Sequence, residues 1–392
     1  MNQPSIVIVG AGMAAYSLAR ELRKLDKVTP LVIIAADGAD AYAKPMLSNA
    51  IALGKGAHQL RSHSAAQMAL QLDATVLAHT RVMAIDTGTR TLKTDKGSVS
   101  YGQLVLAVGA QPIRLPMDGD GAADVLSVNH IDDYAQLRAR LDTLSTPARV
   151  TIIGAGLIGC EFADDLLAGG HHVTLVDPNL RPLAALAAPS LSAGLTKAWA
   201  TRALTLRLGT TVASVARAGD GMLVTLADGD TLDADLVLSA VGLRPMLALA
   251  QAAGLATGRG IMVDAFGQTS VPAIFALGDC AQYARVGVLP YVAPMLAAAR
   301  AIAATLTGTP TPIAHKHEAV IVKTPSYKLA LAPPAPGLPG NWVDEHDGER
   351  TISRFVDEQG QLHGFGLSAH TPALRQKLQS EITNRSDSGC LN

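Results

Sequence analysis

Cysteine, aromatic residues and uncompensated charge are all scarce in this sequence. The 392 residues include three cysteines, Cys160, Cys280 and Cys390, which are too far apart for a C-x-x-C redox or metal motif. We interpret Cys160 and Cys280 as small packing residues, which favours a reducing compartment, the cytoplasm. Aromatic residues make up 4% of the chain and the formal net charge is −1. With no block of like charge, the composition gives no support to a nucleic-acid partner.

Long apolar runs are absent as well. A membrane helix needs about 20 consecutive apolar residues, whereas the most apolar later stretch, 286–306, is interrupted by Pro290, Pro294 and Arg300. The apolar start of the chain has no charged segment before it, so it predicts a first strand rather than a signal peptide. The histidines, including His171-His172 and His315 with His317, are scattered and predict surface residues rather than metal ligands.

The chain is rich in apolar residues (48%) and contains one pattern twice, a β-branched run followed by G-x-G-x-x-G or A. The first glycine permits a tight turn, the second lets backbone approach a pyrophosphate, and the third small residue lets helix and strand pack closely. Free N–H groups and the positive end of the helix dipole then face the phosphates. The turn residues are Gly10, Ala11, Gly12, Met13 and Ala14 in the first copy, and Gly154, Gly156, Leu157 and Ile158 in the second.

Two such turns predict two bound dinucleotides and an α/β fold with two Rossmann-like domains. The alternative is that one turn packs but binds nothing. After the second turn, the strand 173–176 ends at Asp177, where a carboxylate can bind ribose hydroxyls and repel a 2′-phosphate, which favours NADH. Arg181 weakens this preference, since a guanidinium could neutralise that phosphate. In the first domain the equivalent position is the neutral Ala36, and Asp37 either contacts the ribose or caps the turn Asp37-Gly38.

The rest of the chain predicts one split domain, one inserted domain and a third at the C-terminus. The runs 104–110 and 235–245 each predict a buried strand that returns the chain from one domain to another. From about residue 314 the composition changes; strands are predicted near Trp342 and over 352–356, and a helix over 372–382 before a disordered tail, 384–388. The predicted domains are 1–115 with 243–313, then 116–242, and finally a small α+β domain, 314–392.

Together these residues resemble the two-dinucleotide flavoproteins, in which an NAD(P)H domain interrupts an FAD domain, and most closely the rubredoxin reductases among them. The resemblance covers nearly the whole chain. The stretches that carry it are Arg23-Lys24-Leu25-Asp26, Tyr42-x-Lys44-Pro45-Met46-Leu47-Ser48, Gly154-Ala155-Gly156-Leu157-Ile158-Gly159-Cys160-Glu161-Phe162, Ser239-Ala240-Val241-Gly242-Leu243-Arg244-Pro245, Ala276-Leu277-Gly278-Asp279-Cys280-Ala281 and Val322-Lys323-Thr324-Pro325.

The resemblance implies that the first turn holds FAD and that the second, with Asp177 and Gly242, holds NADH. Lys44 and Lys323 would lie by the isoalloxazine ring, with Glu161 near Lys44. Without the resemblance, Lys44 reads as a solvated loop lysine and Glu161 as an acid that favours its helix dipole. Val292 would open a helix aimed at the flavin, and Asp279 would bind a ribityl hydroxyl or approach the phosphates. The remaining FAD contacts implied are Ala36, Asp37, Pro45, Val82, Ala107, Gly109 and Gly278.

For the reaction, the resemblance implies hydride transfer from NADH to flavin and electron transfer, one electron at a time, to rubredoxin, a small acidic iron protein that supports alkane hydroxylation. No cysteine precedes Cys160, so a thiol relay beside the flavin, as in the disulfide reductases, is not supported. A reductase of flavorubredoxin or of an oxygenase ferredoxin is the alternative within this class. A flavin-binding scaffold of the apoptosis-inducing-factor type is the nonenzymatic alternative.

Overall fold

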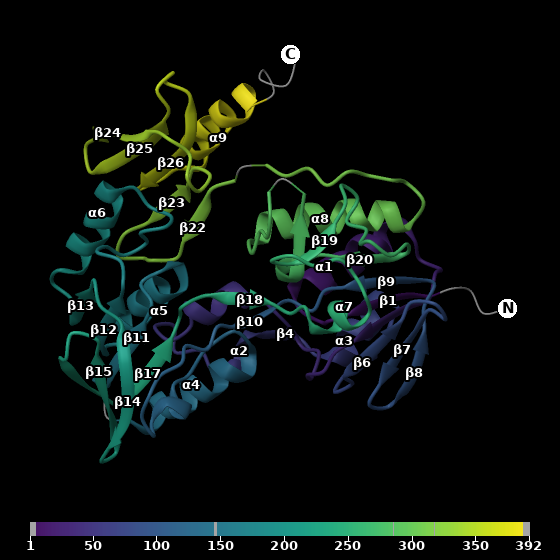
Figure 1. The fold of residues 1–392 in the computed structure, drawn as a ribbon, viewed down its shortest axis with the longest axis horizontal. Coiled ribbons are helices and arrows are strands. Elements are labelled where there is room, and N and C mark those ends of the chain that lie inside the picture. Colours follow the sequence, from purple (N-terminus) through teal and green to yellow (C-terminus); the bar gives the residue numbers. More distant parts are fainter. Residues whose placement is uncertain (1–4, 145–146, 285, 317, 387–392) are drawn as a thin grey trace. The chain divides into compact units, whose positions relative to one another are not determined.

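The computed structural model describes residues 5–144, 147–284, 286–316 and 318–386. Contacts divide the chain into two compact units, which we describe separately. Unit 1 combines residues 1–44, 58–111 and 243–316, and unit 2 combines residues 45–57, 112–242 and 317–392. Each unit is therefore assembled from segments that are distant in sequence, so unit 1 mixes purple and green ribbon in Figure 1.

Unit 1 is built on a parallel sheet with the strand order β20-β9-β1-β2-β5. Its central strand, β1 (Ile6–Val9), is buried along its whole length, as expected for a parallel strand covered on both faces. Helix α1 (Met13–Leu25) buries Ala15, Leu18 and Leu22 at helical spacing and packs against α8 (Val292–Leu306). The other strands are β2 (Leu31–Ile34), β5 (Thr75–Leu77), β9 (Gln103–Leu106) and β20 (Ile274–Ala276).

Smaller elements complete unit 1. Helix α3 (Ala65–Leu72) starts at a capping box formed by Ser64 and Gln67. An antiparallel sheet consists of β6 (Val82–Asp86), β7 (Thr91–Thr94) and β8 (Gly97–Ser100). The remaining elements are β3 (Ala41–Tyr42) with β4 (Arg61–His63), β10 (Ala110–Pro112) with β18 (Leu243–Pro245), β19 (Ile261–Val263) with β21 (Ala281–Tyr283), η3 (Gly278–Cys280) and α7 (Ala248–Ala252). Two short helices, η1 (Lys44–Ser48) and α2 (Ala57–Leu60), extend across the boundaries between the units.

Unit 2 contains a second parallel sheet, with the strand order β13-β12-β11-β17. Its central strand β11 (Arg149–Ile153) leads into α5 (Leu157–Ala168), which is buried over most of its length. The other elements of this part are β12 (His172–Asp177), β13 (Leu204–Leu208), β17 (Leu236–Ser239), η2 (Ala122–Asp124), α4 (Ile131–Thr143), α6 (Pro189–Trp199) and an antiparallel sheet of β14 (Val212–Ala218), β15 (Gly221–Leu226) and β16 (Thr231–Ala234).

The C-terminal part of unit 2 is an antiparallel sheet with the order β22-β23-β26-β25-β24. Phe365, Leu367 and Leu378 belong to its buried apolar core, where α9 (Pro372–Ser386) covers β26. The strands are β22 (Val320–Val322), β23 (Leu329–Ala332), β24 (Asn341–Asp347), β25 (Arg350–Val356) and β26 (Leu362–Ser368).

Helix α6 lies between the parallel sheet and the C-terminal sheet of unit 2. On the C-terminal side, a Cβ placed on Gly366 would lie 2.3 Å from Leu191 Cδ1, so glycine is needed for this close approach. On the other side, the indole Nε1 of Trp199 donates to Asp164 of α5 at 2.8 Å. The backbone N–H of Ser326 donates to the same carboxylate at 3.1 Å. These contacts connect the C-terminal sheet to the parallel sheet.

The predicted fold class is confirmed, because both parallel sheets and the small C-terminal domain are present. Both returning strands are shorter than predicted. In the first, β9 ends at Leu106 and Gly109 takes φ +72°; in the second, Gly242 with φ +104° separates β17 from β18. We keep the division into three domains as a proposal.

Two further differences concern the end of the chain. The strands predicted near Trp342 and over 352–356 are confirmed as β24 and β25, but β22, β23 and β26 were not predicted. Helix α9 continues to Ser386, so the disordered tail predicted from residue 384 is wrong for residues 384–386. Residues 387 and 388 lie outside the described residues. None of the helices in the described ranges combines the length and apolar character that a membrane crossing requires.

Candidate functional site

The first glycine turn connects β1 to α1 in unit 1. Gly10 has φ +115°, and a Cβ there would lie 2.2 Å from the carbonyl oxygen of Ala107, so no larger residue fits. Gly12 is the N-cap of α1; apart from its two chain neighbours, no described residue has an atom within 4 Å of a Cβ placed on it, and no described side chain caps the helix. Among the described residues, no side chain therefore competes with a phosphate for the backbone N–H groups at the start of α1.

The second turn connects β11 to α5 in unit 2 and has the same construction. A Cβ on Gly154 (φ +106°) would lie 2.7 Å from the Ala240 carbonyl oxygen, and one on Gly159 would lie 1.9 Å from the Gly154 carbonyl oxygen. Gly156 is the N-cap of α5 and, among the described residues, has neither a near neighbour for a Cβ nor a capping side chain. Leu157 and Ile158 form the first turn of the helix. Both turns thus fit a pyrophosphate.

Other predicted FAD contacts gather around the first turn. A Cβ on Gly278, which has φ +77°, would lie 2.9 Å from Ala14 Cβ, so η3 packs directly on the start of α1. The next residue, Asp279, has a carboxylate oxygen 3.5 Å from the Lys44 ammonium. Ala11 is buried, Met13 and Ala14 are half-buried, Ala107 lies over Gly10, and Gly109 follows β9.

The residues predicted to bind the adenosine end of FAD are Ala36 and Asp37, at the end of β2. Ala36 is exposed after β2, and Oδ1 of Asp37 accepts the Ala39 N–H at 2.9 Å. This hydrogen bond is the one expected if Asp37 caps the turn, while its ribose contact stays a prediction. Val82 is half-buried at the start of β6, and Val292 is 38% exposed at the start of α8. The N-cap of α8 is Tyr291, and no side chain of the described residues caps the helix there.

Asp177 lies at the carboxyl end of β12, beside the second turn. Its Oδ2 accepts the N–H of Ala155, the residue between Gly154 and Gly156, at 2.6 Å. Its Oδ1 accepts from Asn179, at 2.8 Å from the backbone N and 2.7 Å from Nδ2. The acidic group is therefore fixed against the turn that we interpret as the NADH site. Gly242 is exposed after β17.

A buried charged network in unit 2 connects three predicted residues and one that was missed. Glu161 is 1% exposed, and its carboxylate accepts from Ser48 Oγ at 2.6 Å and from the Lys323 backbone N at 3.0 Å. The ammonium of Lys323 forms an ion pair with the same carboxylate and donates to the Pro45 carbonyl at 2.7 Å and to Ser48 Oγ at 2.9 Å. The predicted proximity of Glu161 to Lys44 stays a prediction, because these two residues belong to different units.

Ser48 was not predicted as a site residue. The only signal for it was its place at the end of the stretch 42–48, because a serine there has no distinctive spacing from Glu161 or Lys323. The interpretation of Glu161 as a plain dipole-favouring acid is not supported. Its carboxylate receives three hydrogen-bond donors, which is what a buried carboxylate requires.

Two of the cysteines and one of the histidines are buried among packed residues. Cys160 and Cys280 are fully buried, and burial raises the pKa of both thiols, that of Cys280 to about 11. The prediction of surface histidines is wrong for His171, which is 7% exposed and whose Nδ1 accepts the Ala148 N–H at 3.3 Å. His317 lies outside the described residues. Among those described, no group of His, Cys, Asp and Glu side chains could hold a metal ion.

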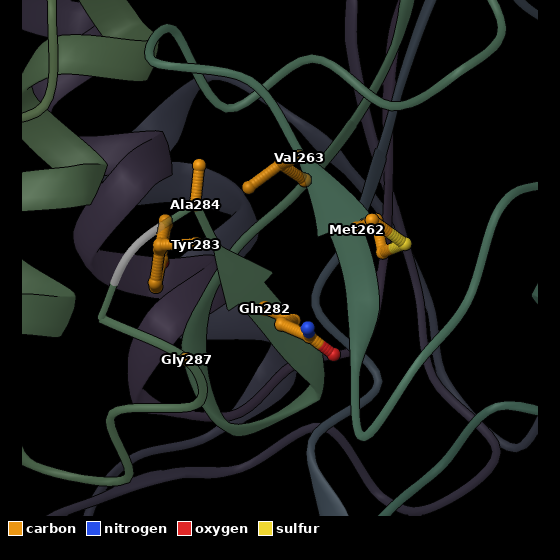
Figure 2. A pocket seen from close by; sticks show the side chains of 6 residues that line it. All are labelled: Met262, Val263, Gln282, Tyr283, Ala284 and Gly287. Atoms are coloured by element: carbon orange, nitrogen blue, oxygen red, sulfur yellow. The ribbon is translucent and has the colours of Figure 1, made fainter.

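Unit 1 also has a pocket of about 410 Å³ beside β19 and β21. Figure 2 shows its lining, to which none of the predicted site residues contributes: Met262, Val263, Gln282, Tyr283, Ala284 and Gly287. The Gln282 amide oxygen accepts the Gly260 N–H at 3.0 Å, so this side chain is engaged in the local backbone structure.

Comparison with known proteins decides between the classes that remain. Residues 4–304 match the family model of the pyridine nucleotide-disulphide oxidoreductases, and residues 312–382 match the rubredoxin binding C-terminal domain. The chain is 40% identical to the rubredoxin-NAD(+) reductase of Alcanivorax borkumensis, over 96% of this chain and 98% of that protein. It belongs to the rubredoxin-NAD(+) reductase family of the pyridine nucleotide-disulphide oxidoreductases.

Further relatives of this reductase carry two different names. The chain is 42% identical to the rubredoxin-NAD(+) reductase of Acinetobacter baylyi (95% of this chain, 96% of that protein). It is also 42% identical to the nitric oxide reductase FlRd-NAD(+) reductase of Aeromonas salmonicida, with the same coverage. The fold matches that of putidaredoxin reductase in its complex with putidaredoxin (TM-score 0.88, 25% identity, 98% of this chain and 94% of that one).

Family membership settles the enzyme class and the cofactors. Members of this family bind FAD and NAD(H), and the protein is an FAD-dependent oxidoreductase. The nonenzymatic scaffold alternative is therefore set aside.

Proposed function

We propose that this reductase transfers electrons from NADH through FAD to the iron of rubredoxin. The observation that supports this function best is the combination of two dinucleotide turns with a C-terminal domain that matches the rubredoxin-binding family. When bound, FAD supplies the redox chemistry, because it takes two electrons from a nicotinamide and releases them singly. The protein supplies binding, orientation and charge.

In this proposal the first turn holds FAD. The backbone N–H groups after Gly12 bind the pyrophosphate, and the Lys44–Asp279 pair lies at the same end of the unit 1 sheet. The positive end of α8, which begins at Val292, and the ammonium group of Lys44 favour negative charge on the reduced ring. Glu161 orients Lys323 through their ion pair. No general base is needed for this chemistry.

The second turn holds NADH. The backbone N–H groups after Gly156 donate to its pyrophosphate. The carboxylate of Asp177 binds the adenosine ribose hydroxyls and repels the 2′-phosphate of NADPH. The supporting observation is the bond from the Ala155 N–H to Asp177, which keeps the carboxylate next to the turn.

The identity of the acceptor is the finer part of the proposal. We propose rubredoxin and, through it, a supply of electrons to alkane hydroxylation. Flavorubredoxin is the second candidate, since proteins named for nitric oxide reductase FlRd are as similar to this chain as those named for rubredoxin. An oxygenase ferredoxin is the third.

A parallel titration tests this choice. The FAD-loaded enzyme is given NADH and increasing rubredoxin, flavorubredoxin or ferredoxin, and acceptor reduction is followed by its absorbance. We expect the highest kcat/KM with rubredoxin. A higher value with flavorubredoxin would reassign the acceptor, and no NADH-dependent reduction of any of the three would refute the function.

A further inference from the structure

The loop that follows β12 is tied to the second glycine turn. Residues 178–188, all within the described part of the chain, form this loop, yet Leu183, Ala187 and Ala188 are at most 2% exposed. Leu183 has φ +56°, a left-handed conformation that is unfavourable for an L-residue with a side chain. Its N–H donates to the Ala155 carbonyl at 2.8 Å. The surrounding contacts therefore outweigh the cost of this conformation.

Ala155 connects the loop to the predicted ribose-binding carboxylate. Its carbonyl oxygen accepts from Leu183, while its N–H donates to Asp177 Oδ2 at 2.6 Å. Asp177 is thus fixed by the glycine turn on one side, and the turn is fixed by the loop on the other. A shift of the loop backbone at Leu183 would therefore reach Asp177 through one residue, Ala155, whose carbonyl group contacts the loop and whose N–H contacts the carboxylate.

Arg181 holds this loop closed. Its guanidinium donates to the carbonyl oxygens of Ala187 and Ala184, at 2.7 and 3.1 Å, and to Ser192 Oγ at 3.0 Å. Ser192 is 1% exposed and donates to the Pro182 carbonyl at 2.7 Å, so the start of α6 closes the loop as well. Burial lowers the pKa of Arg181, and the three acceptors compensate for its loss of hydration.

We propose that Arg181 is a positioning residue for NADH, which fixes Asp177 through the loop and the glycine turn. The guanidinium is directed at loop carbonyls, so binding a 2′-phosphate would require it to give up these hydrogen bonds. This arginine therefore supports the choice of NADH over NADPH, whereas the sequence alone suggested the opposite effect. The proposal rests on the proposed NADH site at the second turn, and it makes no use of rubredoxin.

The test compares Arg181→Lys with a matched control, Arg149→Lys. Lysine keeps the positive charge but has no planar fork, so it cannot satisfy the three acceptors in the same way. Arg149 forms a forked ion pair with Asp235 at the opposite end of β11, away from the turn. The NAD+ affinity of each FAD-loaded enzyme is measured by calorimetric titration, and KM and kcat for NADH and NADPH are measured with ferricyanide as acceptor.

For Arg181→Lys we expect NAD+ to bind about tenfold more weakly, which corresponds to about 1.4 kcal/mol. The preference for NADH over NADPH should fall by a similar factor, with kcat at saturating NADH unchanged. The control should match the wild type in each of these measurements. Unchanged NAD+ affinity and unchanged preference in Arg181→Lys would overturn the proposal.

Melting temperature and the FAD-to-protein ratio show whether the variant is folded. If Arg181→Lys does not fold, the same measurements are made on Ser192→Ala, which removes one acceptor of Arg181; wild-type NAD+ affinity there overturns the proposal. A wild-type enzyme that binds no NAD(H) would instead refute the proposed function, so the two failures are distinguishable.

Discussion

Substitution of Glu161 by glutamine probes the buried network most directly. The change keeps the size of the side chain but removes the negative charge that faces the Lys323 ammonium and the Ser48 hydroxyl. Breaking a buried ion pair by removal of one partner costs about 3–5 kcal/mol. The Lys323 side chain is 29% exposed, so water reaches it and reduces the loss. We expect Glu161→Gln to lower the free energy of unfolding of unit 2 by about 2–3 kcal/mol.

Urea unfolding followed by tryptophan fluorescence measures this loss. The chain has two tryptophans, Trp199 and Trp342, and both lie in unit 2, so the signal reports the unit that contains the network. The matched control is Glu345→Gln, in which the same chemical change breaks the exposed pair of Glu345 with Arg354. An exposed pair contributes about 1 kcal/mol or less. If both variants lose the same stability, the network does not have the role assigned to it.

The remaining predictions concern the two dinucleotide sites. Gly10→Ala should prevent correct folding, because its Cβ would lie 2.2 Å from the Ala107 carbonyl oxygen. Gly12→Ala should fold with unchanged circular dichroism but bind FAD more weakly. FAD retention equal to that of the wild type in Gly12→Ala would contradict the phosphate site. Lys44→Gln should retain FAD but lower the flavin midpoint potential and slow flavin reduction by NADH in stopped flow; two unchanged values would refute its role. Asp177→Ala should reduce the kcat/KM ratio of NADH to NADPH about tenfold or more, and an unchanged ratio would show that another residue discriminates.

The two glycine turns could be predicted from the sequence because their requirements are local. A tight turn, an open backbone and a small packing residue fall within six consecutive positions, so the spacing alone identifies them. The strand ends were predicted less well, because 104–110 is apolar throughout and nothing in its periodicity shows that the chain turns at Gly109. In the C-terminal domain, β22, β23 and β26 are short or contain glycine, which weakens a strand pattern.

The charged network could not be predicted from spacing. Ser48, Glu161 and Lys323 come from three distant segments, and their contacts depend on how unit 2 assembles 45–57, α5 and the C-terminal part. Resemblance to a family suggested the importance of Glu161 and Lys323 but not that they pair with each other. The sequence also could not show where the Arg181 guanidinium points, because every residue has a backbone carbonyl and no pattern marks the ones that accept from it.

The contacts of α6 limit how modular this reductase is. Leu191 contacts Gly366 of the C-terminal sheet, and Trp199 and Ser326 share the carboxylate of Asp164. Removing the chain after residue 313 would therefore expose Leu191 on α6 and would leave the Asp164 carboxylate without its donors from Ser326. To exchange the C-terminal sheet for that of another reductase, the facing side of α6 would have to be exchanged with it.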